Sequence, residues 1–372
     1  MKRVLVSPLS WGLGHATRDL PIIRYFLERG HHVTIAAEGR ALTLLEHEVP
    51  QCDFIEFKDY PSPFTTSRHF ILKFLAMMPM FQTAVNGERR KMERLLRKRK
   101  FDLILSDHRY SVRWPGIPSF IISSMLSVIA PIWMYAEGIG PKLYPIDFLL
   151  EMYNVRTMSR FDRIIVPDEA DDRVHLGCRM THWLDRFDMK RVYYAGIIAN
   201  IKRLHLEEDV DVFITISGPE PQRTELEKVI LAQVERLPGE RIVVTCGKPE
   251  TRRVRRIGDR ITVYDWLSRR EQVEMLNRAR LVVCRSGYTT IMELAELGKK
   301  ALFIPTPYQT EQEYLAWMYG RRGWFHSVSQ YDLDLVRDVE KAKEMPGLPF
   351  RSDTALAVER LYRDLFAPIL DG

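Results

Sequence analysis

The sequence predicts an α/β protein of two domains, each built on a parallel β-sheet and facing the other across a cleft. Two observations support this fold class. Short apolar strands alternate with helical segments along the chain, and the alternation begins a second time near residue 200. Repeated strand–helix units give parallel sheets with helices on both faces. In addition, 372 residues with 46% hydrophobic and 28% charged side chains provide enough apolar material for two cores.

The first half of the chain begins with an apolar strand at 3–6 and a turn that contains glycine. A helix is expected next, because apolar residues recur at helical spacing until Gly30. Further strands are expected at 32–36, 102–105, 119–122 and 163–166. Residues 1–200 are therefore expected to form a Rossmann-like N-terminal domain.

The second half repeats this order of elements. Strands are expected at 212–216, 241–245, 281–284 and 301–304, with a helix at 224–237. Residues 201–350 are therefore expected to form a second Rossmann-like domain. Residues 351–372 contain one more helical pattern, from Thr354 to Phe366, which we expect to pack back on the N-terminal domain.

The net charge of +6 is concentrated in one region. Residues 1–200 carry 28 basic and 22 acidic side chains. Within them, residues 51–100 carry 11 basic and 5 acidic side chains. Within that region, apolar residues at 70–80 precede basic clusters that extend to residue 100. This pattern is typical of a peripheral helix on an anionic bilayer, and a core-packed helix with solvated basic neighbours fits it equally well. The excess positive charge indicates an anionic partner.

The cysteines and the N-terminus indicate the compartment. The four cysteines lie far apart and form no CxxC pair, which favours a reducing environment and argues against disulfides or a zinc knuckle. The first residues show no signal-peptide pattern. We therefore expect a cytoplasmic protein, and the first of the two interpretations of residues 70–100 adds a peripheral contact with the inner face of the membrane.

Three glycine-containing turns, at 12–15, 217–219 and 285–287, each follow an expected strand and precede a helix. Unpaired N–H groups at a helix start attract phosphate, and glycine lets the backbone approach it. Three such turns predict a diphosphate ligand. Arg18 and Asp19 stand where the dinucleotide pattern GxGxxG has its third glycine, which disfavours a hydride-transfer enzyme. A Walker lysine is absent as well.

The third turn and the residues after it resemble a known family. Residues 284–298, followed by 301–305 and 309–314, resemble the donor-binding segment of GT-B glycosyltransferases. The family 28 enzymes are the most similar group: the lipid-linked GlcNAc-transferases of peptidoglycan synthesis and the diacylglycerol glycosyltransferases. Gly12, Gly14 and His15 are similar to the acceptor-side glycine loop of that family.

The resemblance implies a hexosyltransferase with the GT-B fold, in which the N-terminal domain binds an acceptor and the C-terminal domain binds a nucleotide sugar. It would move a sugar, with GlcNAc as one candidate, from a UDP-sugar to a hydroxyl of a lipid-linked or glycan acceptor. The reaction would invert the anomeric configuration and need neither a metal nor a cofactor.

The resemblance also implies roles for single residues on the donor side. Glu293 would bind the ribose hydroxyls, and Gln312, helped by Glu311 or Glu313, the sugar hydroxyls. Leu267, in the segment 264–267, would contact the uracil. The diphosphate would lie against the following residues: Ser217, Gly218, Arg285, Ser286 and Gly287. On the acceptor side, Gly12 and Gly14 would form the loop that faces the acceptor or its phosphate.

A general base must take the proton of the acceptor hydroxyl. His15 is the first candidate, because imidazole titrates near neutral pH. Asp107, followed by His108 at the end of another expected strand, is the second candidate, and the sequence does not decide between His15 and Asp107. The acidic run at 168–172 follows a strand as surface loops do, so we expect no metal site there.

Two other functions are compatible with the sequence. A non-hydrolysing UDP-sugar 2-epimerase shares the two-domain fold and would convert its substrate without an acceptor. A non-catalytic sugar-nucleotide-binding subunit would recruit a partner to the membrane. Nucleic-acid binding is disfavoured, because the basic run at 252–256 has no interleaved aromatic residues and no nucleic-acid-binding domain signature is present.

Overall fold

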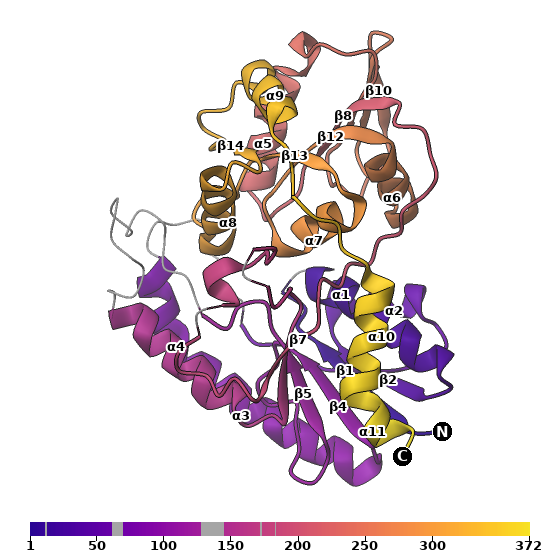
Figure 1. Cartoon of the computed structure of the whole chain (residues 1–372), viewed down its shortest axis with the longest axis vertical. Coiled ribbons are helices and arrows are strands. Elements are labelled where there is room, and N and C mark those ends of the chain that lie inside the picture. Colours follow the sequence, from indigo (N-terminus) through magenta and orange to yellow (C-terminus); the bar gives the residue numbers. More distant parts are fainter. Residues whose placement is uncertain (12, 62–69, 128–144, 172, 183) are drawn as a thin grey trace.

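The computed structural model describes the chain except for residues 12, 62–69, 128–144, 172 and 183. The structure does not describe the side chains of residues 70–75, 78 and 145–147. The chain forms two lobes, each built on a seven-stranded sheet covered by helices (Figure 1). The predicted α/β class with two parallel-sheet domains is confirmed.

The N-terminal sheet has the order β3-β2-β1-β4-β5-β6-β7, and every pair of neighbours is parallel. Its strands are β1 Arg3–Pro8, β2 His32–Ala37, β3 Asp53–Glu56, β4 Leu103–Asp107, β5 Ser119–Ile122, β6 Arg163–Val166 and β7 Val192–Tyr194. Its helices are α1 Leu13–Glu28, α2 Gly39–Glu48, α3 Phe70–Lys98 and α4 Pro145–Met158. In the pairing of β1 with β4, Pro8 lies opposite Asp107. The start of α1 and the end of β4 are therefore neighbours at one edge of the sheet.

The C-terminal sheet has the order β10-β11-β9-β8-β12-β13-β14, and only the β10–β11 pair is antiparallel. Its strands are β8 Val210–Thr215, β9 Ile242–Thr245, β10 Val254–Ile257, β11 Ile261–Tyr264, β12 Ala279–Cys284, β13 Lys300–Phe303 and β14 His326–Ser327. Its helices are α5 Gln222–Leu231, α6 Arg269–Arg278, α7 Tyr288–Leu297, α8 Thr310–Arg321 and α9 Leu335–Glu344. The helix expected at 224–237 ends earlier, and a separate 3₁₀ turn follows at Val234–Arg236.

The chain returns to the N-terminal lobe at its end. The helices α10 Thr354–Leu361 and α11 Ala367–Leu370, joined by a π-helical turn at Tyr362–Phe366, run along this lobe (Figure 1). Leu361 and Phe366 are buried in the same apolar cluster as Leu20 and Phe26 of α1. The last helices are therefore part of the N-terminal core.

The two lobes share a buried junction. Leu176 and Met180, from the connection between β6 and β7, belong to the same apolar cluster as Tyr288 and Tyr319 of the C-terminal domain. The Tyr288 hydroxyl donates to the carbonyl of Pro167 at 3.0 Å, and the Tyr319 hydroxyl donates to the carbonyl of Leu176 at 2.8 Å. These contacts hold the ends of β6 and β12 close together.

The long helix α3 carries the apolar-plus-basic pattern. Its apolar start at 70–75 lies outside the described side chains. Further along, Met92 is buried and packs with Phe57 and Phe101, whereas Met80 is half exposed. The later part of α3 is thus packed on the core, as the second of the two interpretations expects. Within the described chain, none of the helices combines the length and apolarity needed to cross a bilayer.

Candidate active site

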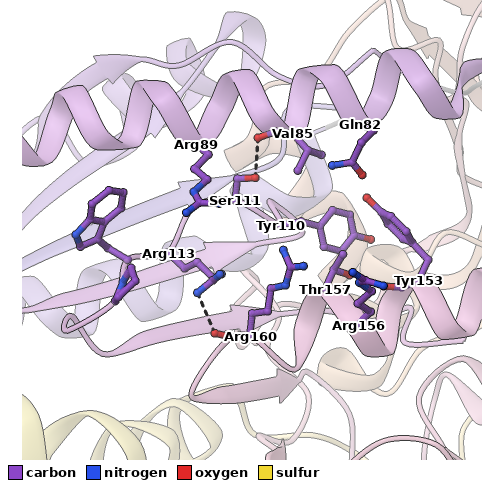
Figure 2. Close-up of a pocket in the computed structure, with 12 residues that line it drawn as sticks. Gln82, Val85, Arg89, Tyr110, Ser111, Arg113, Tyr153, Arg156, Thr157 and Arg160 are labelled. Atoms are coloured by element: carbon purple, nitrogen blue, oxygen red, sulfur yellow. Dashed lines mark hydrogen bonds between the residues drawn. The ribbon is translucent and has the colours of Figure 1, made fainter.

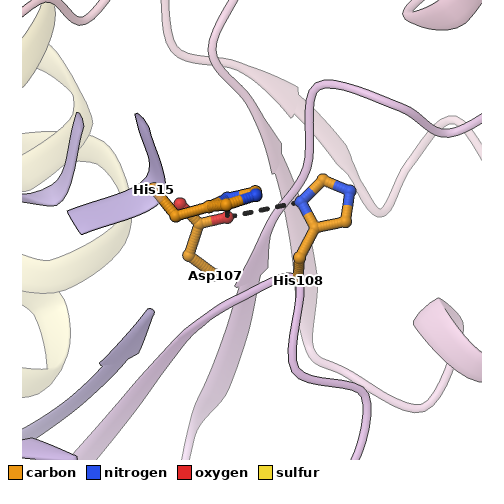
Figure 3. A group of neighbouring side chains, drawn as sticks. All are labelled: His15, Asp107 and His108. Carbon is orange, nitrogen blue, oxygen red and sulfur yellow. Dashed lines mark hydrogen bonds and ion pairs between the residues drawn. The ribbon is translucent and has the colours of Figure 1, made fainter. Parts of the chain in front are cut away.

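His15 lies in the first turn of α1, beside the carboxyl end of β4. Its Nδ1 is 3.0 Å from Oδ1 of Asp107, the last residue of β4 (Figure 3). The parallel pairing of β1 with β4 creates this proximity, because it sets the turn after β1 next to the last residue of β4. The two candidate bases therefore form one pair. Gly12, expected in the same turn, lies outside the described residues.

Arg18 holds the Asp107 carboxylate from one helical turn beyond His15. Its Nε donates to Oδ2 at 3.1 Å, and its NH2 group lies 2.5 Å from Oδ1 and 2.6 Å from Oδ2. Asp107 is fully buried. Burial alone would raise the pKa of this carboxyl group, but the charge of Arg18, together with the hydrogen bonds from His15 and His108, outweighs it and holds the pKa well below its usual range. Asp107 is consequently ionised and fixed in orientation.

The ionised carboxylate determines the tautomer of His15. A carboxylate only accepts hydrogen bonds, so Nδ1 of His15 carries the hydrogen and Nε2 keeps a lone pair. Arg18 NH2 also lies 3.0 Å from Nδ1, but both groups are donors in this tautomer, so this approach adds no hydrogen bond. The His15 side chain is 23% exposed, whereas Asp107 is inaccessible. This is the geometry of a base oriented by a second group.

His108 closes the other side of the pair, in a left-handed backbone conformation with φ of 58°. Its Nδ1 lies 3.3 Å from Oδ1 of Asp107, and its Nε2 lies 3.1 Å from Oγ of Ser123. Burial lowers the pKa of His108 to about 4, so the ring is neutral at physiological pH. Because both ring nitrogens already have partners, His108 supports Asp107 and has no free lone pair for a substrate.

Glu293 lies in α7 and forms an ion pair with Arg269. The Arg269 NH2 group is 2.5 Å from Oε1 of Glu293 and also donates to the carbonyl of Asn200 at 2.6 Å. Arg269 is positioned by a capping box at Ser268, which starts α6. The second oxygen of Glu293, Oε2, accepts no hydrogen bond from the described residues. An acceptor of this kind suits a hydroxyl-bearing ligand.

The residues expected around the diphosphate and sugar are tied together by α8. The Ser286 hydroxyl donates to the carbonyl of Gln312 at 2.8 Å, and Oε1 of Gln312 accepts from the N–H of Thr306 at 2.9 Å. The Gln312 amide nitrogen lies 3.8 Å from the place where a Cβ on Gly287 would stand. Gln312 therefore directs its amide toward the start of α7, where Gly287 is the N-cap.

Two glutamates of α8 differ in what they face. Glu313 accepts from the N–H of Tyr308 at 2.9 Å, and burial raises its pKa. Burial also raises the pKa of Glu311, although the N–H of Tyr288 and the nearby His15 and Arg18 oppose this. Glu311 is thus within electrostatic reach of the histidine from the opposite domain.

The first and third glycine turns meet at the domain junction. A Cβ added to Gly14 would lie 2.8 Å from Oγ1 of Thr289, in the first turn of α7. Only a glycine permits this approach between α1 and α7. The junction therefore places His15 of α1 beside the start of α7, where the N–H of Tyr288 donates to Oε1 of Glu311 at 3.4 Å.

Arg285 corrects one expectation. It does not face a ligand, because it is 2% exposed and all of its guanidinium nitrogens bond to the protein. The acceptors are the carbonyls of Ser217, Gln222, Ile304 and Pro305 and the side chain of Gln330, at 3.0–3.2 Å. Burial lowers the pKa of Arg285 to about 10. Arg285 fastens the second glycine turn to the third.

Leu267 and the second glycine turn are the remaining residues that were expected to bind the nucleotide sugar. The Leu267 side chain is 3% exposed and packs in the apolar cluster at the junction, so only its backbone is available to a base. Ser217 and Gly218 are exposed. Gly218 has φ of +120°, a conformation that L-residues rarely adopt, and it lies near the Thr306 hydroxyl.

The acidic run at 168–172 also differs from expectation at its first residue. Asp168 is buried, not solvated, and accepts hydrogen bonds from the N–H groups of Leu176 and Gly177 and from the Thr181 hydroxyl at 2.7–2.8 Å. Asp168 thereby shapes the loop after β6, which packs at the domain junction.

Two groups in the described chain have ligand-type atoms within 4.8 Å of one another: His15, Asp107 and His108, and Asp168, His175 and His182. Each holds an arginine at hydrogen-bond distance. Arg18 bonds to Asp107, and Arg322 NH2 lies 3.0 Å from Nε2 of His175. A fixed guanidinium charge competes with a cation at both places.

The comparisons with known proteins concern the C-terminal domain and the fold. Residues 222–357 match the glycosyltransferase family 28 C-terminal domain. A UDP-N-acetylglucosamine--N-acetylmuramyl-(pentapeptide) pyrophosphoryl-undecaprenol N-acetylglucosamine transferase of Caldanaerobacter subterraneus is 34% identical over 73 residues, which is 19% of this chain and 20% of that protein. Similar transferases of other bacteria are covered over 26% to 32% of their length.

Two further similarities extend over the whole chain. An uncharacterized glycosyltransferase of Methanosarcina mazei is 20% identical over 96% of this chain and 97% of its own length. The crystal structure of Acinetobacter baumannii MurG superposes with a TM-score of 0.58 at 15% identity, covering 98% of this chain and 99% of that one. The whole chain therefore has the GT-B fold, and the predicted resemblance to family 28 is confirmed for the C-terminal domain.

Proposed function

Because residues 222–357 carry a glycosyltransferase family 28 C-terminal domain on a GT-B fold, we propose that this protein is a glycosyltransferase. It moves a hexosyl group, with GlcNAc as one candidate, from a UDP-sugar to a hydroxyl of a lipid-linked or glycan acceptor. The observation that carries the proposal is the His15–Asp107 pair beside the start of α7. A base and a phosphate-binding helix start are the two elements that this transfer needs.

On the acceptor side, His15 acts as the general base. Its Nε2 lone pair takes the proton of the acceptor hydroxyl as the hydroxyl oxygen attacks the anomeric carbon. Asp107 stabilises the imidazolium that forms, and Arg18 keeps Asp107 ionised. Asp107 orients the base and is itself too deeply buried to reach an acceptor.

On the donor side, the bond from the anomeric carbon to the UDP oxygen breaks, and UDP leaves with increased negative charge. The N–H groups in the first turn of α7 beyond Tyr288, and the exposed turn at Ser217 and Gly218, stabilise that charge. Attack opposite the leaving group inverts the anomeric configuration.

Two donor residues fix the rest of the nucleotide sugar. Glu293 offers Oε2 to the ribose hydroxyls, while Arg269 holds Oε1. Gln312 directs its amide nitrogen to the sugar hydroxyls near Gly287, with Glu313 beside it. The uracil then lies against the backbone of segment 264–267.

We further propose that the protein works in the cytoplasm and contacts the inner face of the membrane. Large apolar side chains are exposed on neighbouring helices: Met80 on α3 and Phe148, Leu149 and Met152 on α4. Basic residues follow on α3 up to Lys98. Such a surface favours an anionic bilayer that carries a lipid-linked acceptor.

Isothermal titration of UDP-sugars against wild type and Glu293→Ala tests the donor assignment. We expect wild type to bind and Glu293→Ala to bind at least about tenfold more weakly, since a charged acceptor is lost. Arg255→Ala, on the exposed strand β10, is the control. Absence of binding to wild type, or equal binding to both variants, would refute the assignment.

Product analysis separates the other two functions. A 2-epimerase would convert a UDP-sugar with no acceptor present. A non-catalytic subunit would bind the donor but release no UDP when acceptor extracts are added. Transfer to an extract component by the purified chain is the result that we expect.

A further inference from the structure

Four arginines surround a cavity of about 390 Å³ in the N-terminal domain, away from the glycine turns. The cavity lies between α3, α4 and the connection from β4 to β5 (Figure 2). Arg89 comes from α3, Arg113 from the connection, Arg156 from α4 and Arg160 from just beyond α4. The volume is in the usual range of small-ligand sites.

Arg89, Arg156 and Arg160 are exposed at the rim of the cavity, and Arg113 is half-buried. None of the four forms an ion pair with a carboxylate of the described residues. Among the described residues, the only hydrogen bond that their side chains donate runs from Arg113 NH1 to the carbonyl of Arg160, at 3.3 Å. Burial and the positive charges of Arg160 and Arg89 lower the pKa of Arg113, although the carboxylate of Asp162 opposes this. The groups therefore repel one another, and a bound anion would relieve this repulsion.

A tyrosine provides a second, independent observation. The Tyr153 hydroxyl is buried in the cavity wall and has no hydrogen-bond partner among the described residues. Its ring stands nearly perpendicular to that of Tyr110 in the same wall, at 81° with the ring centroids 5.9 Å apart (Figure 2). A buried hydroxyl without a partner is costly, and a ligand oxygen would satisfy it.

The chemistry of the cavity selects a phosphate ester. Guanidinium groups match the oxygens of phosphate with two parallel N–H bonds, and a phenol hydroxyl donates a further hydrogen bond. The cavity is also wide enough for several arginines to reach one group from different sides. A diphosphate, with more negative charge than a carboxylate, compensates the four arginines best.

The cavity is connected to the His15–Asp107 pair through two shared segments. Tyr110 of the cavity wall follows Asp107 by three residues. Asn154 of α4 accepts from the Tyr110 hydroxyl at 3.3 Å and donates to the carbonyl of Leu126 at 2.8 Å. Leu126 belongs to the segment after β5 whose serines contact His108 and Arg18.

We propose that this cavity binds a phosphate ester on the acceptor side of the reaction, held by Arg89, Arg113, Arg156, Arg160 and the Tyr153 hydroxyl. The inference rests on the proposed function, in which the N-terminal domain binds the acceptor. The phosphate belongs either to a lipid-linked acceptor or to an anionic lipid headgroup, and the chemistry of the cavity is the same for both.

The test compares Arg113→Gln/Arg160→Gln with Arg255→Gln/Arg256→Gln, which removes the same charge from the exposed strand β10 of the other domain. Inorganic pyrophosphate is titrated calorimetrically in the presence of saturating UDP. We expect the cavity variant to bind pyrophosphate about tenfold more weakly or worse, and the control to bind like wild type. Equal affinity in all three proteins, or complete loss of pyrophosphate binding when UDP is added to wild type, would overturn the proposal.

Tyr153→Phe is the conservative second variant, because it removes only the unpartnered hydroxyl. It should weaken pyrophosphate binding while the thermal midpoint stays equal or rises, since a buried polar group without a partner is lost. Unchanged pyrophosphate binding would remove Tyr153 from the site. Titration of UDP alone separates this inference from the proposed function: a failure of UDP to bind any variant refutes the donor assignment and leaves the pyrophosphate comparison intact.

Vesicles identify the source of the phosphate. Sedimentation is measured with phosphatidylcholine vesicles that contain phosphatidylglycerol. A greater loss of vesicle binding in the cavity variant than in the control assigns the site to lipid headgroups. An equal loss in both variants, together with lost pyrophosphate binding in the cavity variant alone, assigns it to the acceptor. If the cavity variant binds both pyrophosphate and the vesicles as well as wild type does, the proposal is contradicted.

Discussion

The buried carboxylate of Asp107 lies 3.0 Å from Nδ1 of His15 and accepts its hydrogen. This relationship depends on Arg18, which bonds both oxygens of the same carboxylate. Without that guanidinium, burial would favour the protonated acid, and a protonated Asp107 would no longer fix the tautomer of His15. Three residues from α1 and β4 therefore act as one unit.

His15→Ala tests this unit directly. We expect turnover to fall by about 10²–10⁴-fold, because the group that accepts the proton is gone. UDP affinity should stay within about twofold of wild type, since the donor residues lie in the other domain. Steady-state kinetics and calorimetry measure the two quantities. His47→Ala, at an exposed position of α2, is the control, and unchanged turnover in His15→Ala would exclude His15 as the base.

Asp19 predicts how stability depends on pH. It is fully buried beside this unit, and neither of its oxygens has a hydrogen-bond partner in the described chain. Burial, together with the negative charge of Asp107, raises the pKa of Asp19 well above its usual value. The stability that Asp19 contributes is therefore fully present below the pKa of the unfolded chain, about 3.9, and is lost as pH rises toward the folded pKa.

Asp19→Asn removes the titrating group, so the variant does not lose this stability as pH rises. The variant should match wild type near the unfolded pKa and become the more stable protein as pH rises, by up to about 1.4 kcal/mol per pH unit. Urea unfolding at several pH values between about 4 and 8 measures the difference. Asp259→Asn, in the exposed turn after β10, should follow wild type. A difference that does not change with pH would show that Asp19 is ionised in the folded protein.

The fold was predictable where the sequence signal is local. Buried strands such as β1 and β12 read as apolar runs, and the glycine turns follow them directly. The short strands β3, β7, β10, β11 and β14 were not predicted. Three of the four residues of β10 are exposed, and β14 has only two residues, so neither has an apolar pattern.

The site was predictable only in part, because its contacts are non-local. His15 stands next to a glycine in sequence, and Asp107 ends an apolar strand, so each could be named alone. Their pairing spans 92 residues and requires the order of the strands. From the sequence, Arg18 is notable only because it stands where the dinucleotide pattern GxGxxG has its third glycine. Its spacing from His15 does place both on one face of α1, which was the available signal.

Gly14→Ala tests the approach of the two domains. The new Cβ would meet Oγ1 of Thr289 at 2.8 Å and push α1 away from α7. Turnover should fall by about ten- to hundredfold, because a small displacement between the base and the donor misaligns the reacting atoms. The free energy of unfolding should change by less than about 2 kcal/mol, since the higher helix propensity of alanine, about 1 kcal/mol over glycine, offsets part of the cost of the clash.

The double variant Gly14→Ala/Thr289→Ala removes the clashing hydroxyl and should recover most of the lost turnover. Gly87→Ala in α3 is the matched control, because nothing lies within 4 Å of its added Cβ. Absence of rescue by Thr289→Ala would show that the clash is not what lowers the activity.

Arg285→Met distinguishes a structural arginine from a phosphate-binding one. The substitution leaves several buried acceptors around the second and third glycine turns without donors, at about 1–3 kcal/mol each. We expect the free energy of unfolding to fall by at least about 3 kcal/mol. Arg280→Met, on the exposed start of β12, should cost less than about 1 kcal/mol. A large loss of UDP affinity with unchanged stability would instead mean that Arg285 reaches the diphosphate.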